Sequence, residues 1–245
     1  MMKNCNGYIH SVETAATVDG PGIRRVLFLT GCPLNCLYCH NPDTRKKSNG
    51  KLTDAYTELR AIAKNQTLLQ SMNGGVTLSG GEPLCQPEFV KTIFEGCKRM
   101  GIHTALDTSG YLGDKADDEL LSNTDLVLLD IKSMNPTTYK AVAGVDLEAT
   151  LSFAKRLAEK KIPVWLRHVL IPGYTDDLTA LNELASFAHS LGNVERVEIL
   201  PFHKMGEYKW KQLGLDYQLF NTPEPSFDLI NMAKSPFINA GLQVF

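Results

Sequence analysis

Three cysteines stand close together in the sequence, at the spacing C-x3-C-x2-C. Cys32, Cys36 and Cys39 follow the first predicted strand and lie in one short loop. Thiolates are soft ligands, so three of them converging from one loop suit an iron–sulfur cluster or zinc. A [4Fe–4S] cluster that transfers electrons normally has four cysteine ligands. Three cysteines leave one iron without a protein ligand, and chemistry can take place at such an open position.

Other metal or redox sites fit these cysteines less well. Residues 36–40 have the C-x-x-C-H pattern of haem attachment, but that pattern leaves Cys32 unused. A structural zinc site needs four closed ligands, and His40 directly follows Cys39, so both would reach one metal ion only awkwardly. A thioredoxin-like dithiol also leaves Cys32 unexplained. We assign no role to the cysteines that lack a paired spacing, which are Cys5, Cys85 and Cys97.

The composition is that of an ordinary globular protein. The 245 residues include 25 Lys+Arg and 27 Asp+Glu, a net charge of −2, with 43% hydrophobic and 21% charged residues. One domain spanning residues 1–245 is expected. The near-neutral charge argues against a protein held to nucleic acid by bulk charge. No apolar signal segment and no run near the ~18 residues of a membrane span are present, so we expect a cytoplasmic protein away from membranes.

Short β-rich apolar runs alternate with amphipathic stretches along the chain. This alternation is typical of an α/β fold with parallel strands. About six such units are present, fewer than the eight of a closed barrel, and periodicity alone does not separate an open barrel from a doubly wound sheet. Strands are predicted at 24–30, 75–79, 103–107, 126–130, 164–170 and 194–201. Helices are predicted at 87–99, 147–160, 176–191 and 227–239, with loops at 41–50 and 204–226.

Polar residues recur where the predicted strands end. In a parallel β/α barrel, the carboxyl ends of the strands form the active face. Each such residue alone has an ordinary structural explanation, such as a helix cap for an aspartate or a solvated lysine. Their recurrence at most of the strands predicts a site there. These residues are Gly81, Glu82, Asp107, Asp130, Lys132, Arg167 and His203.

Several motifs together resemble those of a known family. The C-x3-C-x2-C triad, Tyr38 before its third cysteine and the SGGEP segment at 79–83 resemble the radical S-adenosylmethionine family. DGPGIR at 19–24, YCHN at 38–41, LDTSG at 106–110, LDIK at 129–132 and LPFH at 200–203 narrow the resemblance to the glycyl-radical enzyme activating enzymes. Residues 41–80 contain no cysteine, so the ferredoxin-like insert of many sister activases is absent. This absence favours the type that acts on pyruvate formate-lyase.

The resemblance implies a fold and a reaction. The fold would be an incomplete, open parallel β/α barrel, with the cluster loop at residues 31–41 and residues 204–245 closing the barrel edge. Reductive cleavage of S-adenosylmethionine at a [4Fe–4S] cluster would give a 5′-deoxyadenosyl radical under anaerobic conditions. That radical would generate a glycyl radical on the glycine loop of pyruvate formate-lyase. A low-potential donor such as flavodoxin would supply the electron, and no residue would act as a general acid or base.

The same resemblance implies roles for individual residues. Cys32, Cys36 and Cys39 would ligate three irons, and the amino and carboxylate groups of S-adenosylmethionine would chelate the fourth. Glycines would let the backbone approach that cofactor, and Lys132 would offer a cation to its carboxylate. The two aspartates would face its ammonium or sulfonium, or hold a small cation. The cofactor-binding set is Tyr38, Cys39, His40, Gly80, Gly81, Glu82, Asp107, Asp130, Ile131, Lys132 and His203; the partner-loop set is Asp19, Gly20 and Arg167.

Several alternatives stay open at this point. The segment at 19–22 is also compatible with a plain tight turn. The protein could activate a different glycyl-radical enzyme, or be a radical enzyme that acts on a small molecule. From other classes, an electron-transfer protein would leave S-adenosylmethionine intact, and a zinc-stabilised binding module would contain no iron.

Overall fold

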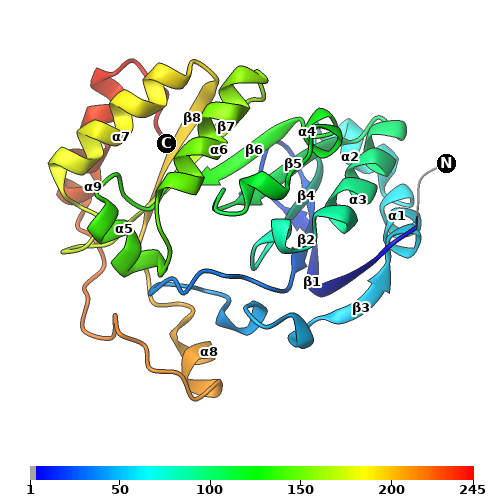
Figure 1. Ribbon diagram of the computed structural model, residues 1–245, viewed down its shortest axis with the longest axis horizontal. Helices are drawn as coiled ribbons and strands as arrows, with labels where there is room; N and C mark the ends of the chain where they lie inside the picture. The colour runs from blue at the N-terminus through cyan, green and yellow to red at the C-terminus, as the bar shows by residue number, and fades with distance from the viewer. Residues whose placement is uncertain (1–3) are drawn as a thin grey trace. The chain divides into compact units, whose positions relative to one another are not determined.

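The computed structural model describes residues 4–245 and has an α/β fold (Figure 1). The chain divides into two compact units. The first contains residues up to Cys32 together with Thr44–Thr108 and Leu112–Leu128, and the second contains Pro33–Asp43, Ser109–Tyr111 and Leu129–Phe245. Residues 1–3 of the predicted domain lie outside the described part.

The first unit is built on a mixed sheet in which the strand order is β3-β1-β2-β4-β5. β2, β4 and β5 run parallel to one another, whereas β1 is antiparallel to both β2 and β3. The inner strands are buried on both faces, as is typical of parallel strands covered by helices. The bounds are β1 (Asn6–Ala16), β2 (Arg24–Leu29), β3 (Lys51–Asp54), β4 (Gly75–Gly80) and β5 (His103–Thr108).

The helices of this unit are amphipathic. In α3, Pro87 begins the helix, where its missing N–H is not needed, and the buried side chains recur at helical spacing on one face. In α1, the Asp54 side chain accepts a hydrogen bond from the Thr57 N–H and so caps the helix. The bounds are α1 (Ala55–Ala63), α2 (Gln66–Ser71), α3 (Pro87–Arg99) and α4 (Asp118–Ser122).

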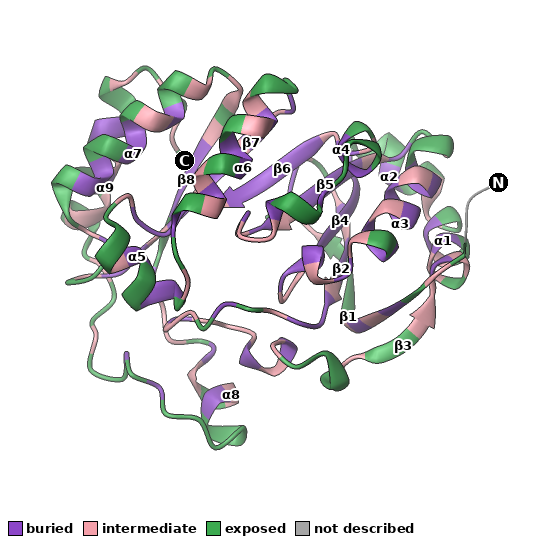
Figure 2. Cartoon of the chain, in the orientation of Figure 1, coloured by how far each residue is buried: buried purple, intermediate pink, exposed green. Residues whose placement is uncertain are grey.

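β6 (Leu126–Asp130) passes from the first unit into the second after Leu128. It is buried along nearly its whole length, as the purple ribbon in Figure 2 shows. In the second unit, β7 (Val164–Leu170) pairs parallel with β8 (Val194–Pro201). The helices of this unit are α5 (Pro136–Ala143), α6 (Glu148–Glu159), α7 (Leu178–Leu191), α8 (Glu207–Gln212) and α9 (Phe227–Asn239), and α7 packs against α9 (Figure 1).

All six predicted strands are present, and two of the four predicted helices, α3 and α9, have the predicted bounds. The helices α1, α2, α4 and α5 have no counterpart among the predicted ranges. Two strands were also not predicted, because their patterns are weak. β1 is exposed over most of its second half, so it lacks a clear alternation of apolar residues, and β3 has only four residues. The predicted loop at 204–226 was wrong over Glu207–Gln212, which form α8. Among residues 4–245, none of the helices combines the length and apolar character that crossing a bilayer requires.

A fully buried arginine fixes the turn that precedes β2. The side chain of Arg24 is 0% exposed. Its Nε donates to Thr77 Oγ1 at 3.0 Å, its Nη2 to the Val76 carbonyl at 2.7 Å and its Nη1 to the Pro21 carbonyl at 3.3 Å. Thr77 Oγ1 in turn donates to the Asp19 carbonyl at 2.7 Å. The guanidinium therefore holds the 19–22 turn against the start of the parallel sheet.

Arg24 also lies beside His103, the first residue of β5. The Arg24 Nη1 is 3.3 Å from His103 Nδ1. Because a guanidinium only donates hydrogen bonds, Nδ1 must accept, and the imidazole is neutral. Burial, with the charge of Arg24 added to it, lowers the pKa of His103 from 6.5 to about 4.

This pKa predicts a pH-dependent stability. The unfolded chain protonates His103 near pH ~6.5 but the folded protein only near the lowered pKa of about 4, so stability falls as the pH drops through this window. In His103→Asn, the Oδ1 can still accept a hydrogen bond from Arg24 but does not titrate. Between about pH 7 and about pH 4.5, we expect the free energy of unfolding of this variant to fall by about 2 kcal/mol less than that of the wild type. Urea unfolding of both proteins at the two pH values measures this. Equal losses in both proteins would contradict the assignment.

Candidate functional site

The cluster loop is anchored to helix α5 by its own backbone. The Asn35 N–H donates to the Ala143 carbonyl at 2.8 Å, and the Leu37 N–H donates to the Val142 carbonyl at 3.0 Å. All three cysteines of the loop lie outside any disulfide and are half-buried. The carbonyl groups at the end of α5, which its own helix leaves without partners, thus position the residues on both sides of Cys36.

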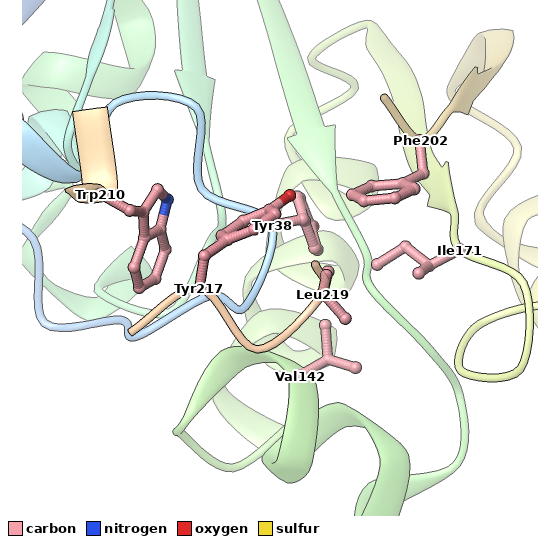
Figure 3. Packing of buried hydrophobic residues seen from close by; sticks show 7 residues of the cluster. All are labelled: Tyr38, Val142, Ile171, Phe202, Trp210, Tyr217 and Leu219. Carbon is pink, nitrogen blue, oxygen red and sulfur yellow. The ribbon is translucent and has the colours of Figure 1, made fainter. Parts of the chain in front are cut away.

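An apolar cluster lies against the loop (Figure 3). Tyr38 comes from the loop itself, and the other buried members come from α5, from the segments that follow β7 and β8, and from α8 and the residues after it. Cys36, Leu37 and Cys39 are partly buried against these side chains. The thiols of the second unit therefore have a largely apolar wall on one side, which limits the access of water. The buried members are Tyr38, Val142, Ile171, Phe202, Trp210, Tyr217 and Leu219.

A buried charged group lies at the carboxyl end of β6. The Nζ of Lys132 donates to Asp130 Oδ2 at 2.5 Å and to the Tyr38 hydroxyl at 2.9 Å. The Lys132 side chain is only 4% exposed. Burial alone lowers the pKa of Lys132, but the Asp130 carboxylate and the Cys36 thiol outweigh that effect, and the pKa is raised well above its usual value. Lys132 therefore keeps its positive charge at neutral pH.

The Tyr38 hydroxyl and the Asp130 carboxylate, which both contact Lys132, are also affected by this environment. Burial, followed by the negative charge of Asp130, raises the pKa of Tyr38, so its hydroxyl stays protonated. Within the described residues, the buried Asp130 Oδ1 has no hydrogen-bond partner. An orphaned carboxylate oxygen next to an ammonium group offers a ready acceptor for a ligand that carries a proton donor or a cation.

Two histidines of the predicted set stack on each other. The rings of His40 and His203 have centroids 4.2 Å apart at an angle of 32°. His40 Nε2 lies 3.2 Å from the His203 carbonyl, so it carries the proton and donates. Burial lowers the pKa of His40, and the nearby His203 and Lys209 lower it further. The His40 ring is therefore neutral at physiological pH.

The glycine segment after β4 packs on the residue before the first cluster cysteine. Gly80 has φ +113°, and a Cβ there would lie 2.4 Å from the backbone of Leu29. A Cβ on Gly81 would lie 2.4 Å from the Gly31 carbonyl oxygen, and the Glu82 N–H donates to that same oxygen at 2.8 Å. Only glycines allow this approach. The SGGEP segment thus fixes the start of the cluster loop.

The acidic residues of the first unit make local hydrogen bonds. Glu82 is 1% exposed, and its Oε1 accepts from the Leu84 N–H at 3.1 Å and from Thr108 Oγ1 at 2.7 Å. Asp107 Oδ2 accepts from Ser79 Oγ at 2.6 Å. These bonds hold each carboxylate in a single orientation at the end of its strand.

The predicted partner-loop residues occupy different elements. Asp19 and Gly20 lie in the turn that Arg24 anchors, and a Cβ on Gly20, which has φ +125°, would lie 3.1 Å from Arg24 Nε. Arg167 lies on β7, where its Nε donates to Glu198 Oε2 on the paired strand β8 at 2.8 Å. Both side chains are about nine-tenths buried, so the pair fixes the guanidinium firmly.

The predicted site residues fall into two groups, one in each unit. Direct contacts join Tyr38, Asp130 and Lys132, and also His40 and His203, in the second unit. Ile131 is fully buried there, so it contributes through its backbone: its N–H donates to the Arg167 carbonyl. The first-unit residues are Asp19, Gly20, Cys32, Gly80, Gly81, Glu82 and Asp107.

Two residues near the site were missed by the sequence analysis. His168 is 1% exposed, and its ring nitrogens lie 3.0 Å from the carbonyls of Ile131 and Thr175, so it holds the residue between Asp130 and Lys132. Trp210 donates its indole N–H to the Cys39 carbonyl at 2.8 Å. No local signal marks Trp210, because it lies far along the chain from the cluster loop; for His168 the strand-end position next to Arg167 was the only available signal.

The donor set suits an iron–sulfur cluster in its chemistry. Three half-buried cysteines without a disulfide lie within eight consecutive residues, and Cys36 and Cys39 have apolar side chains beside them. Among residues 4–245, no three His, Cys, Asp or Glu side chains are already gathered in a form that would hold a single metal ion. Soft thiolate ligands and the orphaned Asp130 oxygen remain the features that favour a cluster with a bound charged cofactor.

Comparison with known proteins assigns the family. Residues 26–185 match the model of the radical SAM superfamily. The chain is 43% identical over 230 residues to the pyruvate formate-lyase 1-activating enzyme of Escherichia coli strain K12, covering 93% of this chain and 94% of that protein. It is 44% identical over 234 residues to the pyruvate formate-lyase-activating enzyme of Staphylococcus epidermidis, covering 93% of each.

The chain belongs to the pyruvate formate-lyase-activating enzymes of the radical SAM superfamily. The crystal structure of a domain of such an enzyme from Bacteroides vulgatus matches with a TM-score of 0.59 and 31% identity, over 70% of this chain and 98% of that one. The predicted open, mostly parallel α/β fold of the radical SAM type is thereby confirmed. Members of the radical SAM superfamily use an iron–sulfur cluster and S-adenosylmethionine.

The buried charge of Lys132 gives a prediction for stability. Lys132→Met leaves the Asp130 carboxylate half-buried without its cation, so we expect the free energy of unfolding to fall by about 3 kcal/mol. The double variant Asp130→Asn/Lys132→Met removes both charges and should recover most of that loss. Urea unfolding checks both values. Lys140→Met is the control, because Lys140 and Asp146 form an exposed pair, whose removal should leave the free energy of unfolding nearly unchanged. An equal loss in the single and double variants would contradict the pairing.

Proposed function

We propose that the protein activates pyruvate formate-lyase by generating a glycyl radical on it. The observation that carries this proposal is the family membership together with the C-x3-C-x2-C loop, in which Cys36 and Cys39 are partly buried against the apolar cluster. In this proposal the whole chain works as one radical SAM domain in the cytoplasm. The relatives at 43% and 44% identity carry this activity in their names, and they match along nearly their whole length.

Cys32, Cys36 and Cys39 would hold a [4Fe–4S] cluster with one iron open to S-adenosylmethionine. When bound and reduced by one electron, these groups would supply a 5′-deoxyadenosyl radical, with methionine as the other product, for removal of a Cα hydrogen atom from the partner's glycine. A glycine Cα is a suitable target because the resulting radical is delocalised over two amide groups. No proton has to move to or from a side chain, so no acid or base is assigned.

The chain's own residues would bind and orient the cofactor. The ammonium of Lys132, whose pKa is raised, offers a permanent positive charge to a carboxylate. The orphaned Oδ1 of Asp130 offers an acceptor of opposite sign within the same side-chain cluster. Gly80 and Gly81 bring the backbone close to the start of the cluster loop, because a Cβ would not fit there. The neutral ring of His40 and the ring of His203 stacked on it would flank the cofactor, together with Glu82, Asp107 and Ile131.

Pyruvate formate-lyase would contact the 19–22 turn and β7. Asp19 and Gly20 would bind the backbone of the glycine loop of pyruvate formate-lyase, since Arg24 holds their turn in one conformation. Arg167 would contribute from β7, where Glu198 fixes its orientation. An external low-potential donor such as flavodoxin would provide the electron. The apolar cluster around Tyr38 would exclude water and other hydrogen donors from the radical.

The central experiment uses the anaerobically reconstituted protein with reductant, S-adenosylmethionine and pyruvate formate-lyase. The proposal expects a glycine-centred EPR doublet and stoichiometric 5′-deoxyadenosine. Deoxyadenosine without the doublet would instead indicate a small-molecule substrate or a different partner. A cluster that changes redox state while S-adenosylmethionine stays intact would indicate an electron-transfer protein, and the proposal would be wrong.

Replacing one cluster ligand tests the metal assignment. We expect Cys36→Ser to lose both cluster and activity, because a hydroxyl is a poor substitute for a soft thiolate. Iron and sulfide analysis with EPR measures this. Cys5→Ser is the matched control: the Cys5 thiol donates to the Glu88 carbonyl at 3.4 Å, a bond that a hydroxyl can keep. Full cluster content in Cys36→Ser would overturn the ligand assignment.

The turn residue Asp19 separates partner binding from cofactor cleavage. We expect Asp19→Ala to reduce radical formation on pyruvate formate-lyase at least about tenfold, the effect of ~1.4 kcal/mol of lost binding. Cleavage of S-adenosylmethionine without the partner should stay at the wild-type rate. Asp146→Ala, at an exposed position, serves as the control. Equal losses of both activities in Asp19→Ala would remove Asp19 from the partner site.

A further inference from the structure

We infer that residues 203–219 form a strap that holds the cluster loop in its ligating conformation, and that Trp210 is the positioning residue of this strap. The inference rests on the proposed function, because it assigns a role toward the cluster. Apart from His203, it concerns residues that neither the sequence motifs nor the family assignment singles out. Both the strap and the part of the loop that it contacts lie in the second unit.

The central contact joins the strap to the third cluster cysteine. The indole Nε1 of Trp210 donates to the Cys39 carbonyl at 2.8 Å, across 171 positions of sequence. Trp210 is 6% exposed, so this bond is shielded from competing water. The Cys39 N–H also bonds within the loop, to the Cys36 carbonyl at 3.3 Å. The peptide groups on both sides of the Cys39 thiol are therefore held in place.

Further contacts hold the residues that follow Cys39. His40 donates to the His203 carbonyl at 3.2 Å. A Cβ on Gly206 would lie 2.7 Å from the His40 Cα, so the strap backbone lies directly against the loop backbone. Lys209 Nζ donates to Asn41 Oδ1 at 2.8 Å and is 3.2 Å from the Asp43 carboxylate.

The strap is itself fixed by packing. The rings of Trp210 and Tyr217 have centroids 5.5 Å apart, and Leu219 is fully buried. By contrast, the strap exposes Met205 and Tyr208. One edge of the segment is therefore part of the apolar cluster, and its polar donors face the loop. Apolar contacts alone would be enough for a segment that only covers the loop. The three hydrogen bonds between the strap and residues 39–41 do more, because they specify one conformation of the loop backbone.

A loop held in one conformation keeps its thiolate on the metal. The net contribution of one buried hydrogen bond corresponds to about a three- to tenfold change in an equilibrium. Without the Trp210 bond, the loop should open more often and release the iron faster. The mixture of loop conformations should also broaden the EPR spectrum of the reduced cluster, because hydrogen bonding and solvent exposure set the electronic properties of the cluster.

The experiment compares Trp210→Phe with the wild type, both reconstituted anaerobically. Phenylalanine keeps an aromatic ring but lacks the N–H donor. We expect iron release to a chelator to be about three- to tenfold faster, with a broadened EPR signal of the reduced cluster. Trp165→Phe is the matched control. Trp165 lies on β7, where the Arg196 guanidinium carbon is 4.5 Å from the centre of its ring, and this variant should release iron at the wild-type rate. Wild-type iron release and an unchanged spectrum in Trp210→Phe would overturn the inference.

Two further measurements keep the test decisive. The chain has two tryptophans, so in Trp165→Phe the fluorescence comes from Trp210 alone, and cluster assembly should quench it strongly. Unquenched fluorescence in the loaded protein would contradict the inference. If Trp210→Phe fails to fold, Lys209→Met removes the bond to Asn41 from a less buried position and should also accelerate iron release. If the wild type itself takes up no [4Fe–4S] cluster, the proposed function is wrong. If the wild type takes up the cluster and the variants release iron at the same rate as the wild type, only the strap inference is wrong.

Discussion

A buried ammonium group is the constraint around which the second unit is organised. Lys132 is 4% exposed and lies 2.5 Å from the Asp130 carboxylate. A charge at this depth is tolerated only when nearby groups compensate it, and the Tyr38 hydroxyl from the cluster loop completes its contacts. The end of β6 and the cysteine loop are therefore linked by one polar cluster. The same charge that must be compensated in the folded protein is the one that a carboxylate-bearing cofactor would meet.

The cysteine loop has little structure of its own, so its shape comes from its surroundings. Backbone bonds from Asn35 and Leu37 tie it to the end of α5, and the indole of Trp210 bonds to the carbonyl of Cys39. In the first unit, Gly81 packs on Gly31 so closely that no Cβ would fit. Radical chemistry requires reacting groups in fixed positions, and a loop supported in this way would meet that condition.

Much of the fold could be predicted because its strands are strongly apolar and its helices strongly periodic. All six predicted strands were found, and α3 and α9 had the predicted bounds. β1 was missed because it is half exposed and antiparallel, and α8 was missed because it has only six residues and its stability comes from Trp210 packing. Short elements of this kind depend on tertiary contacts more than on their own propensity.

The sequence by itself determined the donor chemistry, because three thiols within eight residues stay close together in any fold. It also placed the charged and glycine residues at strand ends, since parallel strands bring those ends to one edge. Only the tertiary structure decided what each group faces: Glu82 accepts from Thr108, Arg167 is held by Glu198, and Cys39 is bonded to Trp210. These partners lie 26 to 171 positions apart in the chain, and such pairings arise from the packing of side chains rather than from any local pattern.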